Sequence, residues 1–327
     1  MNISPSRRAV LAFALLVLFA AACGDDGTTP PPPEVPIPDL HGIGSWPNGE
    51  FDLFAVGDAG TILHYKGIKW EKMASHTTHA LRGVTGIDVN KAFAVGDKGT
   101  ILRYDRPIWT NENSNTTQNL RSVWGTTVDN LIAVGDHGII VQRSGAVWNI
   151  AASGTAQSLY GVYALEDGEA YAVGDAGAVT HRTGGSWSVV PAFTPSRLRS
   201  VWADKPGDWF AVGDNGEIWQ ERGSGWTQMV SPRTDDFYSI AGSDSAFVWA
   251  AGDADSILFY DGIEWTPKAP RHAGRLEGIW AFVCPLAAAL PASGAGLHCS
   301  NTYFAGTTSV VTRFTLLGSY EVMNDPR

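Results

Sequence analysis

The stretch Ala94-Val95-Gly96-Asp97-Lys98-Gly99-Thr100-Ile101-Leu102-Arg103-Tyr104 decides the fold. Its Gly-Asp dipeptide recurs at an interval of 39 residues, six times in succession, and a degenerate seventh copy follows. A fixed period of this length indicates stacked copies of one supersecondary unit. The copies are Gly57-Asp58, Gly96-Asp97, Gly135-Asp136, Gly174-Asp175, Gly213-Asp214, Gly252-Asp253 and Gly306-Thr307.

One copy, from 81 to 120, contains four short runs of β-branched, apolar or aromatic residues. They cover 81–85, 92–95, 100–104 and the residues around Trp109, and Gly, Asp, Asn or Pro separate them. Such runs predict strands, and four strands in about 40 residues are typical of a propeller blade. We therefore predict an all-β fold, a single seven-bladed β-propeller with four antiparallel strands per blade. The predicted blades start at Leu40, Leu81, Leu120, Leu159, Leu198, Phe237 and Leu276.

Three columns of the repeat predict how the blades pack. A bulky residue stands three positions before each Gly, a small residue usually follows it, and a Trp recurs on the fourth strand. Large aromatic side chains on the outer strand can fill the gap that widens between blades away from the axis. The columns are Phe54, Phe93, Ile132, Tyr171, Phe210, Trp249 and Tyr303; Ala55, Ala94, Ala133, Ala172, Ala211 and Ala250; and Trp70, Trp109, Trp148, Trp187, Trp226 and Trp265.

Blade seven contains an insertion. The distance between the sixth and seventh Gly is 54 residues rather than 39, which leaves 15 extra residues, the same number that separates Cys284 from Cys299. We predict a loop at 284–299 between the first two strands of this blade, closed by a Cys284–Cys299 disulfide. Closing a loop of about 15 residues is worth roughly 3 kcal/mol in the chain-entropy model.

The N-terminus has the pattern of an export signal. Arg7 and Arg8 precede an apolar stretch at 9–22, which ends in three alanines before Cys23. A basic start, a short apolar run and small residues are typical of a signal peptide, and a membrane span needs about 20 residues. The placement of Cys23 resembles bacterial lipoproteins, in which this cysteine becomes the lipidated N-terminus; an ordinary signal with a chance cysteine is the alternative. Sec and twin-arginine export both stay open.

We therefore predict a lipoprotein signal peptide at 1–22, a Pro-rich tether at 23–39 and the propeller at 40–327. By resemblance to enterobacterial sorting, Gly24 after the cysteine favours the outer membrane or cell surface. Without residues 1–22 the chain has 21 Lys and Arg against 33 Asp and Glu, a net charge of −12. An acidic body argues against nucleic acid and anionic lipid as partners, so the lipid anchor is the only membrane contact that we expect.

Two repeated polar features have both a structural and a functional interpretation. The Gly-Asp aspartates either cap their own turns, as we favour, or form a ring of ligand sites; they are Asp58, Asp97, Asp136, Asp175, Asp214 and Asp253. Hydroxyls before each following blade either cap loops, which we also favour, or bind sugar; they are Thr77, Thr116, Thr155 and Thr194, with Ser75, Ser114 and Ser153.

The stretch at 94–104 resembles the repeats of BNR-type, YVTN-like and photosystem II assembly-factor-like propellers. The likeness covers about residues 40–322. The Asp box of those repeats is reduced here to Tyr260-Asp261-Gly262-Ile263-Glu264-Trp265. The resemblance implies seven blades and a role in binding or assembly, and it does not transfer sialidase activity.

Functional residues are expected where the copies differ on one face, which the Gly-Asp turns share with the loops that enter each first strand. The candidate binding residues are His76, Arg82, Arg121, Arg199, Asp235, Asp236 and Arg271. The residues after each leading Leu or Phe should approach the channel mouth; they are His41, Arg82, Arg121, Tyr160, Arg199, Tyr238 and Glu277. Arg and Tyr suit recognition of acids, sugars or peptide carbonyls.

We find no nucleophile elbow, zinc-protease motif or P-loop, and we assign no catalytic residue, metal or cofactor. His76 and His79 lack a third ligand for a metal.

These features favour a non-enzymatic, monomeric envelope lipoprotein that binds or assembles a protein partner on its propeller face. A surface lectin and a polysaccharide hydrolase or lyase remain as alternatives. In the enzyme, arginines such as Arg82, Arg121 and Arg199 would hold an acidic sugar. Repetition separates the two, since a lectin repeats its polar loop residues and an enzyme needs one unique cluster.

Overall fold

The computed structural model describes residues 38–46, 52–67, 69–268, 275–283, 300–306, 311–315 and 320–323. In this part of the chain 28 strands form seven four-stranded antiparallel sheets, each built from consecutive strands. The strands are β1 (Leu40–Gly44), β2 (Leu53–Gly57), β3 (Ile62–Tyr65), β4 (Trp70–Met73); β5 (Leu81–Asp88), β6 (Lys91–Gly96), β7 (Ile101–Asp105), β8 (Ile108–Glu112); β9 (Leu120–Thr127), β10 (Asn130–Gly135), β11 (Ile140–Ser144), β12 (Val147–Ala151); β13 (Leu159–Ala164), β14 (Ala170–Gly174), β15 (Val179–Thr183), β16 (Ser186–Val190); β17 (Leu198–Lys205), β18 (Asp208–Gly213), β19 (Ile218–Glu221), β20 (Trp226–Gln228); β21 (Phe237–Asp244), β22 (Phe247–Gly252), β23 (Ile257–Tyr260), β24 (Trp265–Lys268); and β25 (Leu276–Val283), β26 (Ser300–Gly306), β27 (Val311–Thr315), β28 (Tyr320–Met323).

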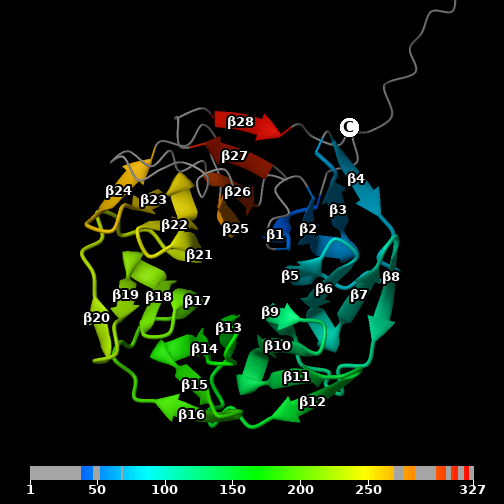
Figure 1. The fold of residues 1–327 in the computed structure, drawn as a ribbon, viewed down its shortest axis with the longest axis horizontal. Helices are drawn as coiled ribbons and strands as arrows, with labels where there is room; N and C mark the ends of the chain where they lie inside the picture. Colours follow the sequence, from blue (N-terminus) through cyan, green and yellow to red (C-terminus); the bar gives the residue numbers. More distant parts are fainter. Residues whose placement is uncertain are drawn as a thin grey trace, which may run out of the picture. The chain divides into compact units, whose positions relative to one another are not determined.

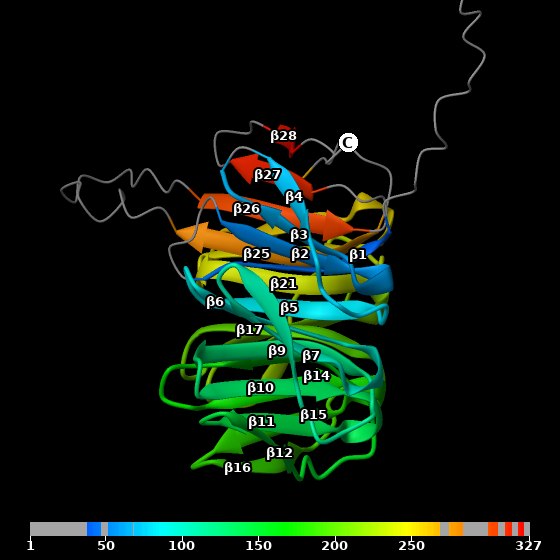
Figure 2. The same ribbon diagram turned by 90° about the vertical axis from the view of Figure 1, so that its right-hand side faces the viewer.

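The sheets stand as blades around a central axis, with the first strand of each blade innermost (Figure 1). Figure 2 shows the same blades edge-on. Each inner strand contacts the inner strand of the next blade, and β25 contacts β1, so the ring closes. Every blade takes its four strands from one continuous stretch of chain. Side-chain and backbone contacts between the first and seventh sheets therefore close the ring, without a blade shared by the two ends of the domain.

The repeated columns form the core between blades. The six bulky residues from Phe54 to Trp249 are 6% exposed or less, and the six alanines that follow them are fully buried. Of the outer tryptophans, Trp70, Trp109, Trp148 and Trp265 are buried, and Trp187 and Trp226 are half-buried. These observations confirm the packing predicted for the columns in the first six blades.

The Gly-Asp-x-Gly turn joins the second and third strands of a blade, and its geometry explains both glycines. In the second blade Gly96 is extended, and a Cβ there would lie 2.1 Å from the Ala80 carbonyl oxygen of the chain that enters β5. Gly99 has a φ of +71°, and a Cβ there would lie 2.0 Å from the Thr116 carbonyl oxygen. The first glycine thus permits close approach of two backbones, and the second also supplies left-handed geometry.

The aspartate of this turn has a different role from the one that the sequence suggested. The turn closes through the backbone, where the Thr100 N–H donates to the Asp97 carbonyl at 3.2 Å. The Asp97 N–H donates to the Ala80 carbonyl at 2.9 Å, which fixes the entering loop on the same face as the turn. The Asp97 side chain accepts hydrogen bonds from Arg82 on the inner strand. The prediction that the aspartate side chain caps its own turn was therefore wrong.

The inner strands approach one another more closely than the sequence analysis recognised. A Cβ on Gly161 would lie 2.8 Å from the Arg199 carbonyl oxygen and 2.8 Å from the Ser200 Cα. Two serines at this third position of the strand bond the next blade: Ser200 Oγ accepts the Ile240 N–H at 3.3 Å, and Ser239 Oγ accepts the Ile279 N–H at 3.1 Å. Small residues at this position bring the inner strands together around the channel.

The predicted strand starts are confirmed at all seven inner strands, but the strand end in the second blade was set too early. The sequence analysis ended the first run of this blade at residue 85, whereas β5 continues to Asp88 through a register shift between Gly86 and Asp88. The predicted insertion falls between β25 and β26, where Val283 pairs with Ser300.

Several sequence predictions lie outside the described residues: the signal peptide, Cys23, the tether up to residue 37, Cys284, Cys299 and Arg271. The lipid anchor and the disulfide thus stay predictions. No helix in the described part of the chain is long and apolar enough to cross a membrane.

Candidate functional site

The inner strands enclose a channel of about 330 Å³, and polar residues line its mouth on the face of the Gly-Asp turns. The second residue of each inner strand lines it. We call these residues the arginine mouth: His41, Arg82, Arg121, Tyr160, Arg199, Tyr238 and Glu277. The sequence analysis predicted that this column approaches the mouth, and the structure confirms the placement.

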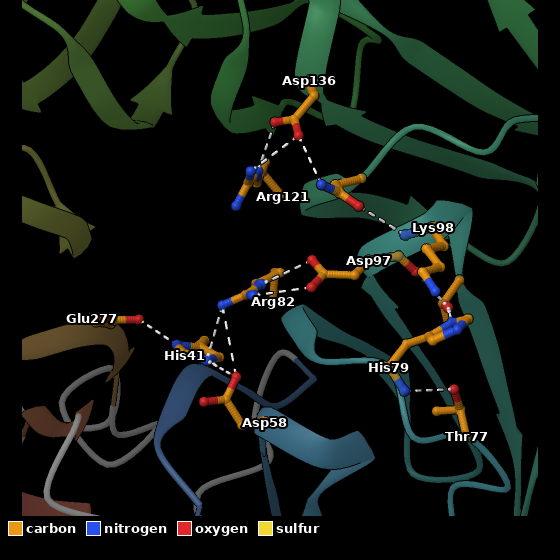
Figure 3. Close-up of polar contacts among 12 residues, drawn as sticks. His41, Asp58, Thr77, His79, Arg82, Asp97, Lys98, Arg121, Asp136 and Glu277 are labelled. Atoms are coloured by element: carbon orange, nitrogen blue, oxygen red, sulfur yellow. Dashed lines mark hydrogen bonds and ion pairs between the residues drawn. The ribbon is translucent and has the colours of Figure 1, made fainter.

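Each arginine of the mouth clamps the turn aspartate of its own blade. Arg82 Nε and Nη2 donate to the two carboxylate oxygens of Asp97, both at 3.1 Å. Arg121 donates in the same way to Asp136 at 2.8 and 3.0 Å (Figure 3). Burial opposes ionisation of Asp136, but the bonds from Arg121 outweigh it and lower the pKa of this carboxyl. Paired parallel hydrogen bonds fix the plane of each guanidinium and leave one edge for other contacts.

The third clamp joins two blades. Arg199 Nε donates to Asp214 at 2.5 Å, and Arg199 Nη2 donates to Asp236 of the following blade at 3.3 Å. Asp236 Oδ1 also accepts the Asn215 N–H at 2.9 Å. Nη1 of Arg121 and Nη1 of Arg199 make no hydrogen bond to any described residue. Figure 3 shows one end of the Arg121 guanidinium turned away from Asp136.

Two tyrosines occupy the arginine mouth in place of arginine. Tyr160 donates to Asp175 at 3.2 Å, and Tyr238 donates to Asp253 at 3.0 Å. Burial, followed by the charge of the neighbouring aspartate, raises the pKa of the Tyr160 hydroxyl, so it stays a neutral donor. Arg197 lies 4.9 Å from the Tyr160 ring centroid, and Arg275 and Arg199 lie 3.8 and 4.3 Å from that of Tyr238. Cation–π contact therefore helps to hold these rings beside guanidinium groups.

The junction between the first and seventh blades carries a histidine between two carboxylates. His41 Nδ1 lies 2.6 Å from Glu277 Oε2, and Nε2 lies 2.7 Å from Asp58 Oδ1 (Figure 3). Burial disfavours the charged ring, but the bonds to Glu277 and Asp58 outweigh it and raise the pKa of His41. Arg82 Nη1 lies 3.0 Å from Nε2 and limits this rise by repulsion.

Positive charge does not dominate the mouth, because carboxylates outnumber arginines around it. The described arginines are Arg82, Arg121, Arg197, Arg199 and Arg275, and their neighbouring acids are Asp58, Asp97, Asp136, Asp175, Asp214, Asp236, Asp253 and Glu277. Five guanidinium groups thus face eight carboxylates. This arrangement favours directional hydrogen bonding to neutral acceptors over capture of a polyanion.

The other candidate binding residues do not join the mouth. Asp235 accepts a hydrogen bond from Ser256 at 2.5 Å inside the sixth blade. His76 lies exposed in the loop between the first two blades, with a φ of +59°. His79 bonds Thr100 at 2.8 Å, and no cluster of three metal-binding side chains occurs among the described residues.

The repeated hydroxyls that a lectin would use are engaged by their own loops. Ser114 Oγ donates to the Thr116 carbonyl at 3.1 Å, and Thr116 Oγ1 accepts the Gln118 N–H at 3.1 Å. The same pattern recurs at Ser75–Thr77 and Ser153–Thr155, and the three serines are buried. These loops pack against the second glycine of the turn, which explains why their sequence repeats.

Sequence reasoning missed Arg275 and the pairing of the two polar columns. A signal was present, since Arg or Tyr precedes the turn aspartate by 15 residues at Arg82, Arg121, Tyr160, Arg199 and Tyr238. The turn aspartate directly follows the strand that pairs with the inner strand, as Leu81 pairs with Gly96, so a constant spacing between complementary side chains there predicts contact.

No protein-family model and no curated protein matches this chain. Two solved structures are similar to it in three dimensions. The first is YCF48 bound to D1 peptide, with 18% sequence identity, a TM-score of 0.64, and coverage of 84% of this chain and 91% of that one. The second is YCF48 from Cyanidioschyzon merolae, with 15% identity, a TM-score of 0.65, and coverage of 86% and 97%. At this level of identity the likeness identifies the described domain as a β-propeller of the fold that these structures share.

Proposed function

We propose that this protein is a non-enzymatic propeller that binds a segment of a protein partner at the arginine mouth. The arginine clamps carry the proposal. Asp97, Asp136 and Asp214 hold three guanidinium planes in place, and Nη1 of Arg121 and Arg199 has no other partner among the described residues. Fixed donors of this kind suit the carbonyl oxygens of a peptide, because little side-chain entropy is lost on binding. The similar structure of YCF48 with a bound D1 peptide supports a propeller as a peptide receptor.

The same geometry favours this function over the two alternatives. An enzyme that holds an acidic sugar would need guanidinium charge to spare, whereas aspartates at hydrogen-bonding distance already neutralise these arginines. A lectin would need the repeated loop hydroxyls, which bond their own backbone.

We further propose that the protein is a lipoprotein of the bacterial envelope, anchored through Cys23 at the outer membrane or cell surface. The pattern of residues 1–23 supports this address, and the Pro-rich tether supplies the reach. Radiolabelled fatty acid should enter the wild type and not Cys23→Ala. Equal labelling of both proteins would contradict the anchor and leave the binding proposal intact.

The binding proposal is tested by affinity capture from envelope extract, followed by a peptide array of the captured protein. The variant Arg121→Gln, Arg199→Gln should lose the partner, because it removes both sets of free donors. Arg222→Gln is the matched control, since this arginine is 61% exposed and lies away from the mouth, beside Asp208. Near-ultraviolet circular dichroism should show the same fold in all three proteins.

Capture that survives the double substitution would place the binding surface elsewhere. Turnover of a glycan, or saturable binding on a glycan array without a protein partner, would replace the proposal by one of its alternatives.

A further inference from the structure

A second cavity opens at the other end of the inner strands, beside the hairpins that join the first and second strands of the blades. It has a volume of about 290 Å³. Blades two to five line it, with Ile87, Trp124, Tyr163, Glu166 and Asp204 as its main side chains. Trp124 stands three residues after Arg121, and a strand rises about 3.3 Å per residue. The cavity therefore lies about 10 Å deeper along the channel than the arginine mouth.

Aromatic rings form the inner wall of this cavity. Trp124 and Tyr163 are stacked, with centroids 4.4 Å apart and an interplanar angle of 26°. Trp202 is buried and does not line the cavity, and its ring centroid lies 6.3 Å from that of Tyr163. Trp124 Nε1 donates to the Ala164 carbonyl at 3.0 Å, which fixes its ring. Burial raises the pKa of the Tyr163 hydroxyl, so this ring stays neutral.

Two carboxylates border the same cavity. Glu166 is exposed and makes no hydrogen bond or ion pair with any described residue. Asp204 accepts a bond from Ser245 at 3.2 Å and lies 3.4 Å from Lys205 Nζ, whose side chain is 62% exposed. Such an exposed pair is weak and yields readily to a better cation. No lysine or arginine is among the described residues that line the cavity.

Electron-rich ring faces beside carboxylates are the chemistry that recognises organic cations. A polyanion would meet two carboxylates here, and a neutral apolar ligand would leave them unpaired on binding. The two ends of the channel thus differ in kind, since one presents clamped guanidinium groups and the other presents aromatic rings with acids.

We propose that the cavity lined by Trp124, Tyr163, Glu166 and Asp204 is a binding site for an alkylammonium group. That group is carried either by a small free cation or by the lysine side chain of a peptide. Trp124 and Tyr163 also line the channel, but none of the seven residues of the arginine mouth lines this cavity, so the site and its ligand differ from those at the mouth.

The test uses the purified protein with tryptophan indole nitrogens labelled for NMR. The probes are choline, its neutral isostere 3,3-dimethylbutan-1-ol, and Nα-acetyl-lysine amide. Choline should shift the indole signal of Trp124 saturably, and the isostere should bind about fivefold more weakly or worse, because it lacks the charge. Assignment of the Trp124 signal comes from Trp124→Phe.

Glu166→Gln should weaken choline binding about threefold to fivefold, the effect of one nearby charge in water. Its side chain has no described partner, so the fold should be unaffected. Glu264→Gln is the matched control, an exposed glutamate outside the cavity, and should bind choline like the wild type. Binding of acetyl-lysine amide together with choline assigns a lysine side chain as the ligand, and binding of choline alone assigns a free cation.

Three results would overturn the proposal. The isostere binds as tightly as choline, Glu264→Gln weakens binding as much as Glu166→Gln, or neither ammonium probe moves the Trp124 indole signal.

Discussion

His41 should stabilise the closed ring in acidic solution more than in alkaline solution. The ring has no shared blade, so contacts between the first and seventh sheets close it, and His41 bridges Asp58 and Glu277 at that seam. A hydrogen bond to a charged group contributes about 1.5–3 kcal/mol, and exposure of a partner reduces the value. Asp58 is 46% exposed and Glu277 is 18% exposed, so we discount the first bond strongly. The substitution His41→Gln should therefore cost about 2 kcal/mol of stability when the imidazole of His41 is charged.

The pH dependence follows from the direction of the shift. The pKa of His41 is raised in the folded protein, because the bonds to Glu277 and Asp58 outweigh burial. A raised pKa adds stability that is fully present below the unfolded value of about 6.5 and is lost as the pH rises through the folded value. The cost of His41→Gln should thus be largest near about pH 5.5 and smaller near about pH 8.5.

Urea unfolding followed by tryptophan fluorescence at these two pH values measures the effect. His181→Gln is the matched control, because His181 bonds Glu169 at 2.9 Å within one blade and does not bridge the seam. Equal destabilisation by His41→Gln at both pH values would refute the role of the charged imidazole. A pH dependence of the same size in His181→Gln would refute the role of the seam.

Three further predictions concern the scaffold. Gly99→Ala should destabilise the protein by more than about 2 kcal/mol, because the added Cβ would lie 2.0 Å from the Thr116 carbonyl oxygen. Gly223→Ala, at a similar φ with nothing within 4 Å, should cost only the left-handed strain of about 1 kcal/mol. Thermal unfolding compares the two variants, and equal losses of stability would contradict the close-approach argument. Trp148→Phe should cost about 1–3 kcal/mol of stability, because Trp148 Nε1 donates to Glu112 at 2.7 Å. Trp109→Phe should cost less, because the buried Nε1 of Trp109 has no partner among the described residues. Urea midpoints in the reverse order would count against this reasoning. Cys284→Ala should lower stability by roughly 3 kcal/mol if the predicted disulfide closes the insertion, and two free thiols in mass spectra of non-reduced wild-type peptides would remove the bridge.

The sequence of this protein predicts the scaffold well because the scaffold is local. Each blade forms its ladder within about 40 residues, so strand runs, turn glycines and buried columns appear in every copy at the same place. Leu81 and Gly96 could be assigned to a strand start and a close turn without the structure. The side-chain role of Asp97 could not be assigned from the turn motif alone, because its partner, Arg82, lies on another strand.

The two candidate sites, one at each end of the channel, depended on the tertiary structure. His41 and Glu277 are 236 residues apart and meet only because the seventh blade returns to the first. Trp124, Tyr163 and Asp204 occupy three different blades and line one cavity only because inner strands with small third residues converge there. A repeat fixes the unit and its period, whereas ring closure determines which of its variable side chains become neighbours.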